Sequence, residues 1–144
     1  MKIEDIMTEW KKDSKLDEID LDTSSMSIPN LHSKWIDLLT KARQKQRSLN
    51  IKKKHLHKTL FQYYRGELNN PEDLEEIGRE PLLNKPLNSD TLMFVDADEE
   101  MINLNLKIAY QTEVVEVLTD IMKFIHNLNW VIRNAIEHRK HINP

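Results

Sequence analysis

Lysine and arginine residues are concentrated in one stretch of the chain. Ten of the twenty-one basic residues lie between Lys34 and Arg65, and Asp37 is the one acidic residue among them. The whole chain carries a net charge of −3, so the remainder of it is acidic. A solvated helix face usually mixes both signs of charge, because ion pairs four residues apart stabilise it. This uncompensated stretch therefore indicates an anionic partner, and a phosphate backbone is the most common one.

Several of these cations share one side of a helix, because basic residues recur at positions 47, 54, 58 and 65. Aromatic residues adjoin them at positions 61, 63 and 64. Lysines that follow a backbone, beside rings on which bases can stack, suit single strands bound without sequence preference. A duplex reader would instead carry Arg, Asn or Gln poised for base edges. The predicted DNA-binding residues are Arg47, Lys53, Lys54, Lys58, Tyr64 and Arg65.

Enzyme chemistry finds little support in this sequence. It contains no phosphate-binding glycine loop, no dinucleotide fingerprint, no HExxH and no GxSxG. There are no cysteines, which excludes thiolate nucleophiles and disulfides. His55 and His57 are two residues apart and would point to different faces of a helix. We therefore predict a non-enzymatic protein with no catalytic residue, no metal site and no cofactor.

The basic stretch is predicted to form a helix over residues 28–65. Its apolar stripe is wide at both ends and thin from Arg43 to His55, so the ends would dock while the middle stays exposed. Ser27 suits the N-cap, with Pro29 in the first turn, and Gly66 suits the C-terminal end. A short amphipathic helix with apolar residues at 3, 6, 7 and 10 should dock on the core, and residues 15–25 read as a linker.

An acidic connector is expected over residues 66–97. Asn70 and Pro71 have the form of a helix start, and Gly78 is the matching stop. The apolar run over residues 91–95 is the one strand-like segment of the chain, so a small β element is expected there.

A long C-terminal helix is predicted from about residue 98. Two adjoining apolar seams run along it with alternating spacings of three and four residues. A stripe of that width can pack against a neighbour on each side, which favours self-association in a bundle or ring. The alternative is a central helix wrapped by the chain's own helices. The predicted oligomerisation residues are Val114, Leu118, Ile121, Phe124, Ile125, Leu128 and Ile132.

These elements predict a mainly α fold with few glycines and long helices. We expect an N-terminal DNA-binding region over residues 1–97 and an oligomerisation helix over 98–144. The sequence has neither a signal-peptide pattern nor an apolar run long enough to span a membrane, so a cytoplasmic protein that does not contact membranes is the simplest expectation.

Several short motifs, in a consistent order and spacing, match a known family. They are Glu4-Asp5, Lys11-Lys12-Asp13, Ser33-Lys34-Trp35, Lys53-Lys54, Lys58, Tyr63-Tyr64 with Gly66, and Val95-Asp96. Through these residues the chain resembles, nearly end to end, the UvsY family of recombination mediator proteins of T4-like bacteriophages. The segment over residues 67–90 matches least.

The resemblance implies a homo-oligomeric ring, a hexamer or heptamer, that binds single-stranded DNA in the cytoplasm of the infected bacterial host. It also implies loading of a RecA-like recombinase onto DNA covered by single-strand-binding protein, in recombination, repair and recombination-dependent replication. Lys58 matches the lysine of the family's basic DNA-binding element. That element carries an arginine two residues later, where this chain has Leu60; Lys54 or Arg65 could substitute for it.

Two other functions also agree with the residues taken alone. One is a coiled-coil structural adaptor whose basic face meets an acidic protein. The other is an architectural protein that binds duplex DNA without sequence preference.

Overall fold

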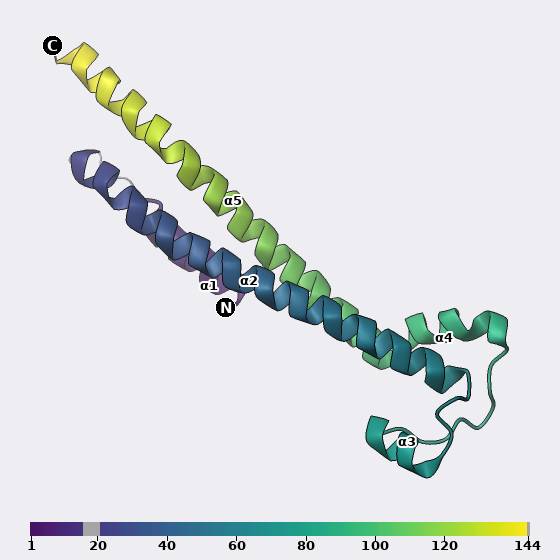
Figure 1. Cartoon of the computed structure of the whole chain (residues 1–144). Coiled ribbons are helices and arrows are strands. Elements are labelled where there is room, and N and C mark those ends of the chain that lie inside the picture. The colour runs from purple at the N-terminus through teal and green to yellow at the C-terminus, as the bar shows by residue number, and fades with distance from the viewer. Residues whose placement is uncertain (16–20, 144) are drawn as a thin grey trace. The chain divides into compact units, whose positions relative to one another are not determined.

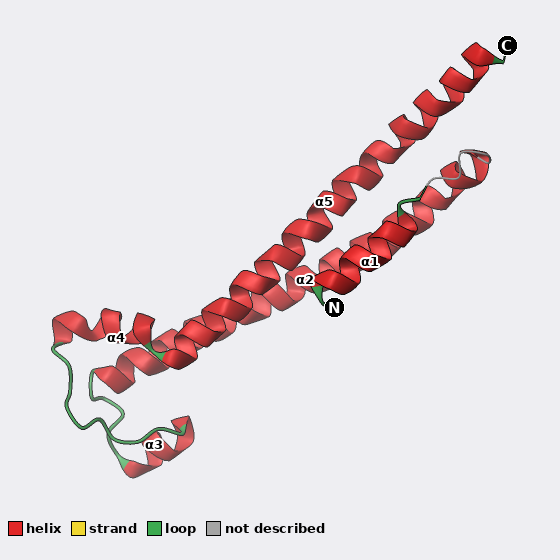
Figure 2. Cartoon of the chain, turned by 180° about the vertical axis from the view of Figure 1, so that it is seen from behind, coloured by secondary structure: helices red, strands yellow, loops and turns green. Residues whose placement is uncertain are grey.

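The computed structural model describes the backbone of residues 1–15 and 21–143, and the side chains of residues 1–15 and 26–143. Over these ranges the chain is helical and contains no strand, as Figures 1 and 2 show. The predicted mainly α fold is confirmed. The α-helices are α1 (Ile3–Asp13), α2 (Leu21–Tyr64), α3 (Pro71–Ile77), α4 (Thr91–Ala97) and α5 (Glu99–Ile142), with a 3₁₀ turn at Asn88–Asp90.

The chain forms two compact units, and each long helix contributes a part to both. Unit 1 comprises residues 1–45 and 111–144, and unit 2 comprises residues 46–110. The predicted division assigns DNA binding to residues 1–97 and oligomerisation to residues 98–144, and it stays a prediction.

The core of unit 1 joins α1, the first half of α2 and the second half of α5. Trp35 is completely buried, and Ile6, Leu118 and Ile125 are each 1% exposed. Trp10 of α1 packs edge-on against Trp35 and against Phe124, with ring centroids 5.5 Å apart in each case. The amphipathic N-terminal helix therefore docks on the chain's own core, as its spacing predicted.

Polar contacts hold α1 in place on α2. The Lys34 ammonium lies 2.7 Å from Glu9 and 2.6 Å from Asp13. The Trp35 indole N–H donates to the same Asp13 carboxylate at 3.1 Å. Asp13 therefore ties one charged and one buried side chain of α2 to the end of α1.

The start of α2 differs from the prediction. The helix begins at Leu21 rather than near Ser27, and Pro29 lies inside it. An internal proline removes one backbone hydrogen bond. Ile28 is buried in the unit 1 core and Leu31 packs against that core, so tertiary packing outweighs the local preference. Residues 21–25 of the expected linker are helical, and residues 16–20 lie outside the described residues.

Unit 2 is built around the last turns of α2. Leu60 and Val95 are completely buried and Met101 is 1% exposed, with Leu56 and Phe61 packed beside them. Helix α2 ends at Tyr64, and Gly66, just beyond it, has φ +76°. The amides of Gly66 and Glu67 donate to the carbonyls of Tyr63 and Gln62. These two bonds form a Schellman motif, which confirms Gly66 as the C-terminal stop.

The short helix α3 follows its predicted signals. The Asn70 side chain accepts a hydrogen bond from the Asp73 amide at 2.8 Å, and Pro71 occupies the first turn. Gly78 ends the helix in the left-handed conformation. The predicted helix start at Asn70 and Pro71 and the predicted stop at Gly78 are therefore confirmed.

The expected small β element is wrong. Residues 91–97 form helix α4, in which Thr91 and Val95, four residues apart, are both buried. A five-residue apolar run satisfies strand and helix patterns about equally, and burial of one helical face decides between them here.

Candidate nucleic-acid interface

The second half of α2 has one buried side and one exposed side. Leu60 and Tyr63 are buried in unit 2, and Leu56 is half-buried. Arg47, Lys54 and Lys58 are exposed on the opposite side of the same helix. The structure therefore places these three predicted DNA-binding residues together on one accessible face.

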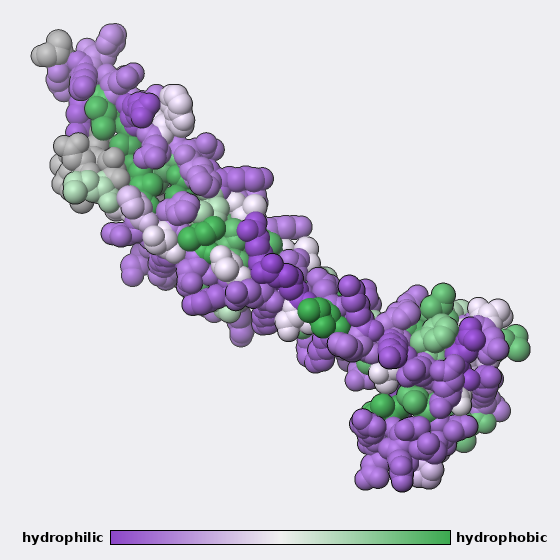
Figure 3. Space-filling model, in the orientation of Figure 1, coloured by the Kyte–Doolittle hydropathy of each residue, from purple (hydrophilic) through white to green (hydrophobic). Residues whose placement is uncertain are grey.

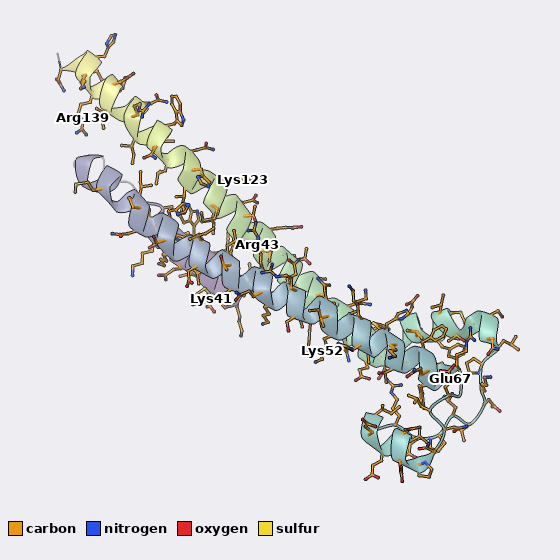
Figure 4. The ribbon with its side chains drawn as sticks, in the orientation of Figure 1. Lys41, Arg43, Lys52, Glu67, Lys123 and Arg139 are labelled. Carbon is orange, nitrogen blue, oxygen red and sulfur yellow. The ribbon has the colours of Figure 1, made fainter. Side chains whose placement is uncertain are left out.

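These cations carry charge that no carboxylate of the described chain neutralises by direct contact. Near the start of α2, Lys34 pairs with Glu9 and Asp13, and Lys41 pairs with Asp37 at 2.9 Å. By contrast, the run over residues 52–54, together with Arg47 and Lys58, makes no ion pair with any described residue. Figure 4 shows the side chains of α2, with Lys52 labelled. An exposed face of this kind attracts polyanions.

Lys53 and Lys54 also line a shallow, open depression together with Asn50 and His57. Each of these side chains can donate a hydrogen bond to an anion: two ammonium groups, an amide and an imidazole N–H. The depression is thus a place where a phosphate group can be contacted by several donors at once.

Tyr64 and Arg65 lie in a different environment from the exposed cations. The Tyr64 hydroxyl donates to Asp98 at 2.6 Å, and its ring packs on Phe94 with centroids 5.6 Å apart. The Arg65 guanidinium stacks over the Phe61 ring at 4.9 Å and is half-buried. Both side chains therefore have contacts within unit 2, and their predicted DNA contacts stay predictions.

A carboxylate that the sequence did not single out organises this end of unit 2. Asp98 accepts hydrogen bonds from both terminal nitrogens of Arg79 at 2.7 and 2.8 Å, from the Tyr64 hydroxyl, and from the Glu100 amide at 3.0 Å. Burial alone would raise the pKa of Asp98, but the hydrogen bonds from Arg79 and Tyr64 and the Arg79 charge lower it to about 2. Asp98 thus stays ionised and caps the start of α5.

Of the contacts around Asp98, the sequence pattern indicated only the start of the C-terminal helix. The helical pattern was expected to begin near Asp98, where an acidic N-cap is favourable. Arg79 lies in the segment between α3 and the 3₁₀ turn, where no periodicity indicates its partner. The Arg79 guanidinium also reaches Glu100 at 2.9 Å and stacks over the Tyr63 ring at 5.1 Å.

Leu60, where the family element carries an arginine by resemblance, is a core position in this chain. Its side chain is completely buried among Val95 and Met101. Lys54 is exposed on the same helix, whereas Arg65 is half-buried. Of the two substitutes suggested by the sequence, Lys54 is therefore the more accessible, and a phosphate contact by either residue stays a prediction.

The predicted oligomerisation residues divide into two groups. Phe124 is 45% exposed, whereas the other six are buried within unit 1 against α1 and α2; these six are Val114, Leu118, Ile121, Ile125, Leu128 and Ile132. Val131, from the second seam, is 43% exposed. The buried seam thus serves the chain's own core, and the assignment of these residues to a subunit interface stays a prediction.

Among the residues that the structure describes, no cluster of three or more potential metal ligands occurs. No helix among the described residues is long and apolar enough to cross a membrane.

An all-helical fold with an exposed, uncompensated cationic face is typical of a protein that binds a nucleic-acid backbone. Residues 9–143 match the model of the family described as recombination, repair and single-stranded-DNA-binding protein UvsY. The chain belongs to the UvsY family.

Solved structures of this family share the fold. A crystal structure of the recombination mediator protein UvsY of bacteriophage T4, in lattice type II, matches with a TM-score of 0.84 and 19% sequence identity, over 100% of this chain and 99% of that one. The lattice type IV structure of the T4 protein matches with a TM-score of 0.84 and 18% identity, over 98% of this chain and 99% of that one. A search of curated protein sequences finds no match.

Proposed function

We propose that this protein is a non-enzymatic recombination mediator that binds single-stranded DNA through the exposed face of α2. The observation that carries the proposal is a set of exposed cations, Arg47, Lys54 and Lys58, that pair with no described carboxylate, in a chain that belongs to a recombination, repair and single-strand-binding family. Lys53 and His57 extend the same site through the depression that they share with Lys54.

The proposed mechanism is multivalent electrostatics. A few lysines on one subunit bind a single strand weakly, because each contact is screened by salt. A homo-oligomeric ring, a hexamer or heptamer, repeats the cationic face, so each further contact becomes intramolecular and the overall affinity rises steeply. The exposed residues Phe124 and Val131 of α5 are available for such an assembly.

In the proposed role, DNA held in this way loosens the single-strand-binding protein that covers it and offers a RecA-like recombinase a place to assemble. The protein would act in recombination, repair and recombination-dependent replication, in the cytoplasm of the infected bacterial host. Binding, rather than a bond-making step, performs this work, so no catalytic residue is required.

The experiment that tests the DNA site is titration of a fluorescent single-stranded oligonucleotide at several salt concentrations. For single strands, the log–log salt slope falls by roughly 0.7 for each phosphate contact removed. Lys54→Ala combined with Lys58→Ala should therefore reduce the slope by about 1.4 per occupied subunit site, and should weaken binding. Lys107→Ala combined with Lys123→Ala removes the same charge from exposed positions of α5 and is the matched control.

The outcomes also separate the other functions. Unchanged single-strand affinity in a correctly assembled Lys54→Ala, Lys58→Ala variant would reject this site. A salt slope near zero for the wild type would favour the structural adaptor, since phosphate binding requires salt dependence. Tighter binding to duplex than to single strands would favour the architectural protein.

A further inference from the structure

The depression on the second half of α2 has more room than a phosphate group needs. Asn50, Lys53, Lys54 and His57 line it, and its volume is about 410 Å³. Pockets that hold small organic ligands have volumes of about 300–1,000 Å³. The four residues occupy positions i, i+3, i+4 and i+7, so one face of the helix supplies all of them. We call this space the α2 depression; it can take a planar ring together with a phosphate.

The His57 ring is supported on one side by groups from the next two turns of α2. Its plane makes an angle of 16° with that of the Phe61 ring, and the two ring centroids are 6.5 Å apart. The Arg65 guanidinium lies 4.9 Å from the Phe61 centroid. Phe61 also packs against the buried cluster of unit 2 around Leu60. The imidazole is therefore held in a defined orientation, which lowers the entropic cost of stacking a ligand on it.

The opposite face of the His57 ring borders the α2 depression. Phe61 follows His57 by four residues, whereas the other residues that line the depression precede it by three, four and seven. Side chains of the preceding and following turns flank a helical residue from opposite directions along the axis. A flat aromatic face is thus turned towards the two lysines, and another ring can stack on it.

The remaining groups of the α2 depression suit the other parts of a nucleotide. The ammonium groups of Lys53 and Lys54 attract phosphates, and neither pairs with a described carboxylate. The Asn50 amide both donates and accepts hydrogen bonds, so it can meet the polar edge of any base. On the face shown in Figure 3, hydrophilic residues cover most of the second half of α2, as expected for a surface that binds a charged polymer.

A stacking face of this kind is available to a single strand but not to a duplex. In a duplex each base is covered by its neighbours, whereas the bases of a single strand can turn outward onto a protein ring. Cations alone bind the phosphates of either form. Selectivity for single strands therefore needs a ring in addition to the lysines, and stacking supplies it without sequence preference because every base has a π face.

We propose that the α2 depression binds one base of single-stranded DNA, which stacks on the His57 ring while Lys53 and Lys54 contact the adjoining phosphates. The inference rests on the proposed function and assigns the base-contacting residue of that same site. His57 is then the residue through which this face of α2 distinguishes a single strand from a duplex.

The test compares two fluorescent strands with the same number of phosphates, one of oligothymidylate and one of abasic deoxyribose units. The whole chain is titrated with each strand at several salt concentrations. We expect the wild type to bind oligothymidylate roughly fivefold or more tightly than the abasic strand, because a stacked base contributes about that factor. The log–log salt slopes should agree, because the slope counts phosphate contacts. Equal affinity for the two strands would overturn the inference.

Three variants test whether the base contact belongs to the ring of His57. His57→Ala should bring the affinities for the two strands to nearly the same value and leave duplex affinity unchanged. His57→Tyr keeps a ring and cannot carry a positive charge, so it should retain the preference for oligothymidylate. His55→Ala removes an exposed histidine on a different side of α2, and this matched control should keep the wild-type preference.

Two results with these variants would also contradict the inference. An undiminished preference for oligothymidylate in His57→Ala would place the base at another residue. Loss of the preference in His57→Tyr would assign the effect to charge rather than to stacking.

The outcomes separate the inference from the proposed function. If the base contact alone fails, both strands still bind with a salt dependence, and phosphate binding through Lys54 and Lys58 stands. If neither strand binds in a salt-dependent way, the proposed DNA site is rejected and the inference with it.

Discussion

Both terminal nitrogens of Arg79 reach the two carboxylate oxygens of Asp98, at 2.7 and 2.8 Å, and this pair joins the segment after α3 to the start of α5. The Asp98 side chain is 5% exposed and that of Arg79 is 20% exposed. The bidentate geometry satisfies the guanidinium and the carboxylate together. Because Asp98 also accepts from Tyr64, the same carboxylate holds the end of α2.

Arg79→Ala should destabilise unit 2 strongly. It leaves the buried Asp98 carboxylate without its cation, and breaking a buried ion pair in this way costs about 3 kcal/mol. Urea unfolding measures the loss. Lys41→Ala is the control, since its pair with Asp37 is exposed and should contribute less than about 1 kcal/mol. Equal effects of the two substitutions would show that the Arg79–Asp98 contact is no stronger than a surface pair.

The free energy of unfolding should depend on pH through the Asp98 carboxylate. The pKa of Asp98 is lowered from its ordinary 3.8 to about 2 in the folded chain, so the unfolded state binds the proton more readily. The stabilisation is then complete above about pH 4 and is lost as the pH falls towards 2. By linkage it amounts to about 2 kcal/mol. Urea titrations between pH 2 and 6 should show this loss in the wild type, and Arg79→Ala should show a smaller one.

Position 60 offers a sharp test of how far the family pattern can be transferred. Leu60→Arg restores the arginine that the resemblance implies, but it places a charge where the side chain is completely buried. We expect it to destabilise unit 2 by more than about 3 kcal/mol rather than to strengthen DNA binding. Thermal unfolding followed by circular dichroism, together with oligonucleotide titration, measures both effects. A stable variant with tighter DNA binding would show that Leu60 can leave the core.

The buried and exposed faces of the long helices could be predicted from the sequence, because they depend on long periodic patterns. Apolar spacing placed Ile6, Trp35 and Leu60 on buried faces, and the unmatched cations indicated an exposed side of α2. Two features depended instead on tertiary packing. Because Ile28 is buried, α2 continues on the N-terminal side of Pro29. Because Thr91 and Val95 are buried on one face, the strand-like run over residues 91–95 forms a helix.

The polar contacts were harder to foresee for a related reason. Arg79 and Asp98 are nineteen residues apart, and Arg79 lies between helices. Only the fold brings the two groups together, and no local spacing encodes such a pair. The hydrogen bond that the Tyr64 hydroxyl donates to Asp98 follows from the same meeting of segments.

A substitution in α5 tests assembly only if the substituted residue lies outside the core of unit 1. Ile121 is 5% exposed in the core of unit 1, so Ile121→Asp should cost more than about 4 kcal/mol of folding stability. Loss of the oligomer in that variant would therefore report unfolding as well as dissociation. Val131 is 43% exposed, so a charge placed there leaves the core intact.

Val131→Asp should give a folded monomer or smaller oligomer if the exposed seam of α5 contacts a neighbouring subunit, because a carboxylate would be buried there without a partner. Sedimentation velocity measures the assembly, and circular dichroism confirms that the helices remain. Asn129→Asp introduces the same charge at an exposed position on another side of α5 and should sediment as the wild type does. If Val131→Asp also sediments as the wild type, the subunit interface lies on a different face. The multivalent mechanism would then need a ring built through other residues.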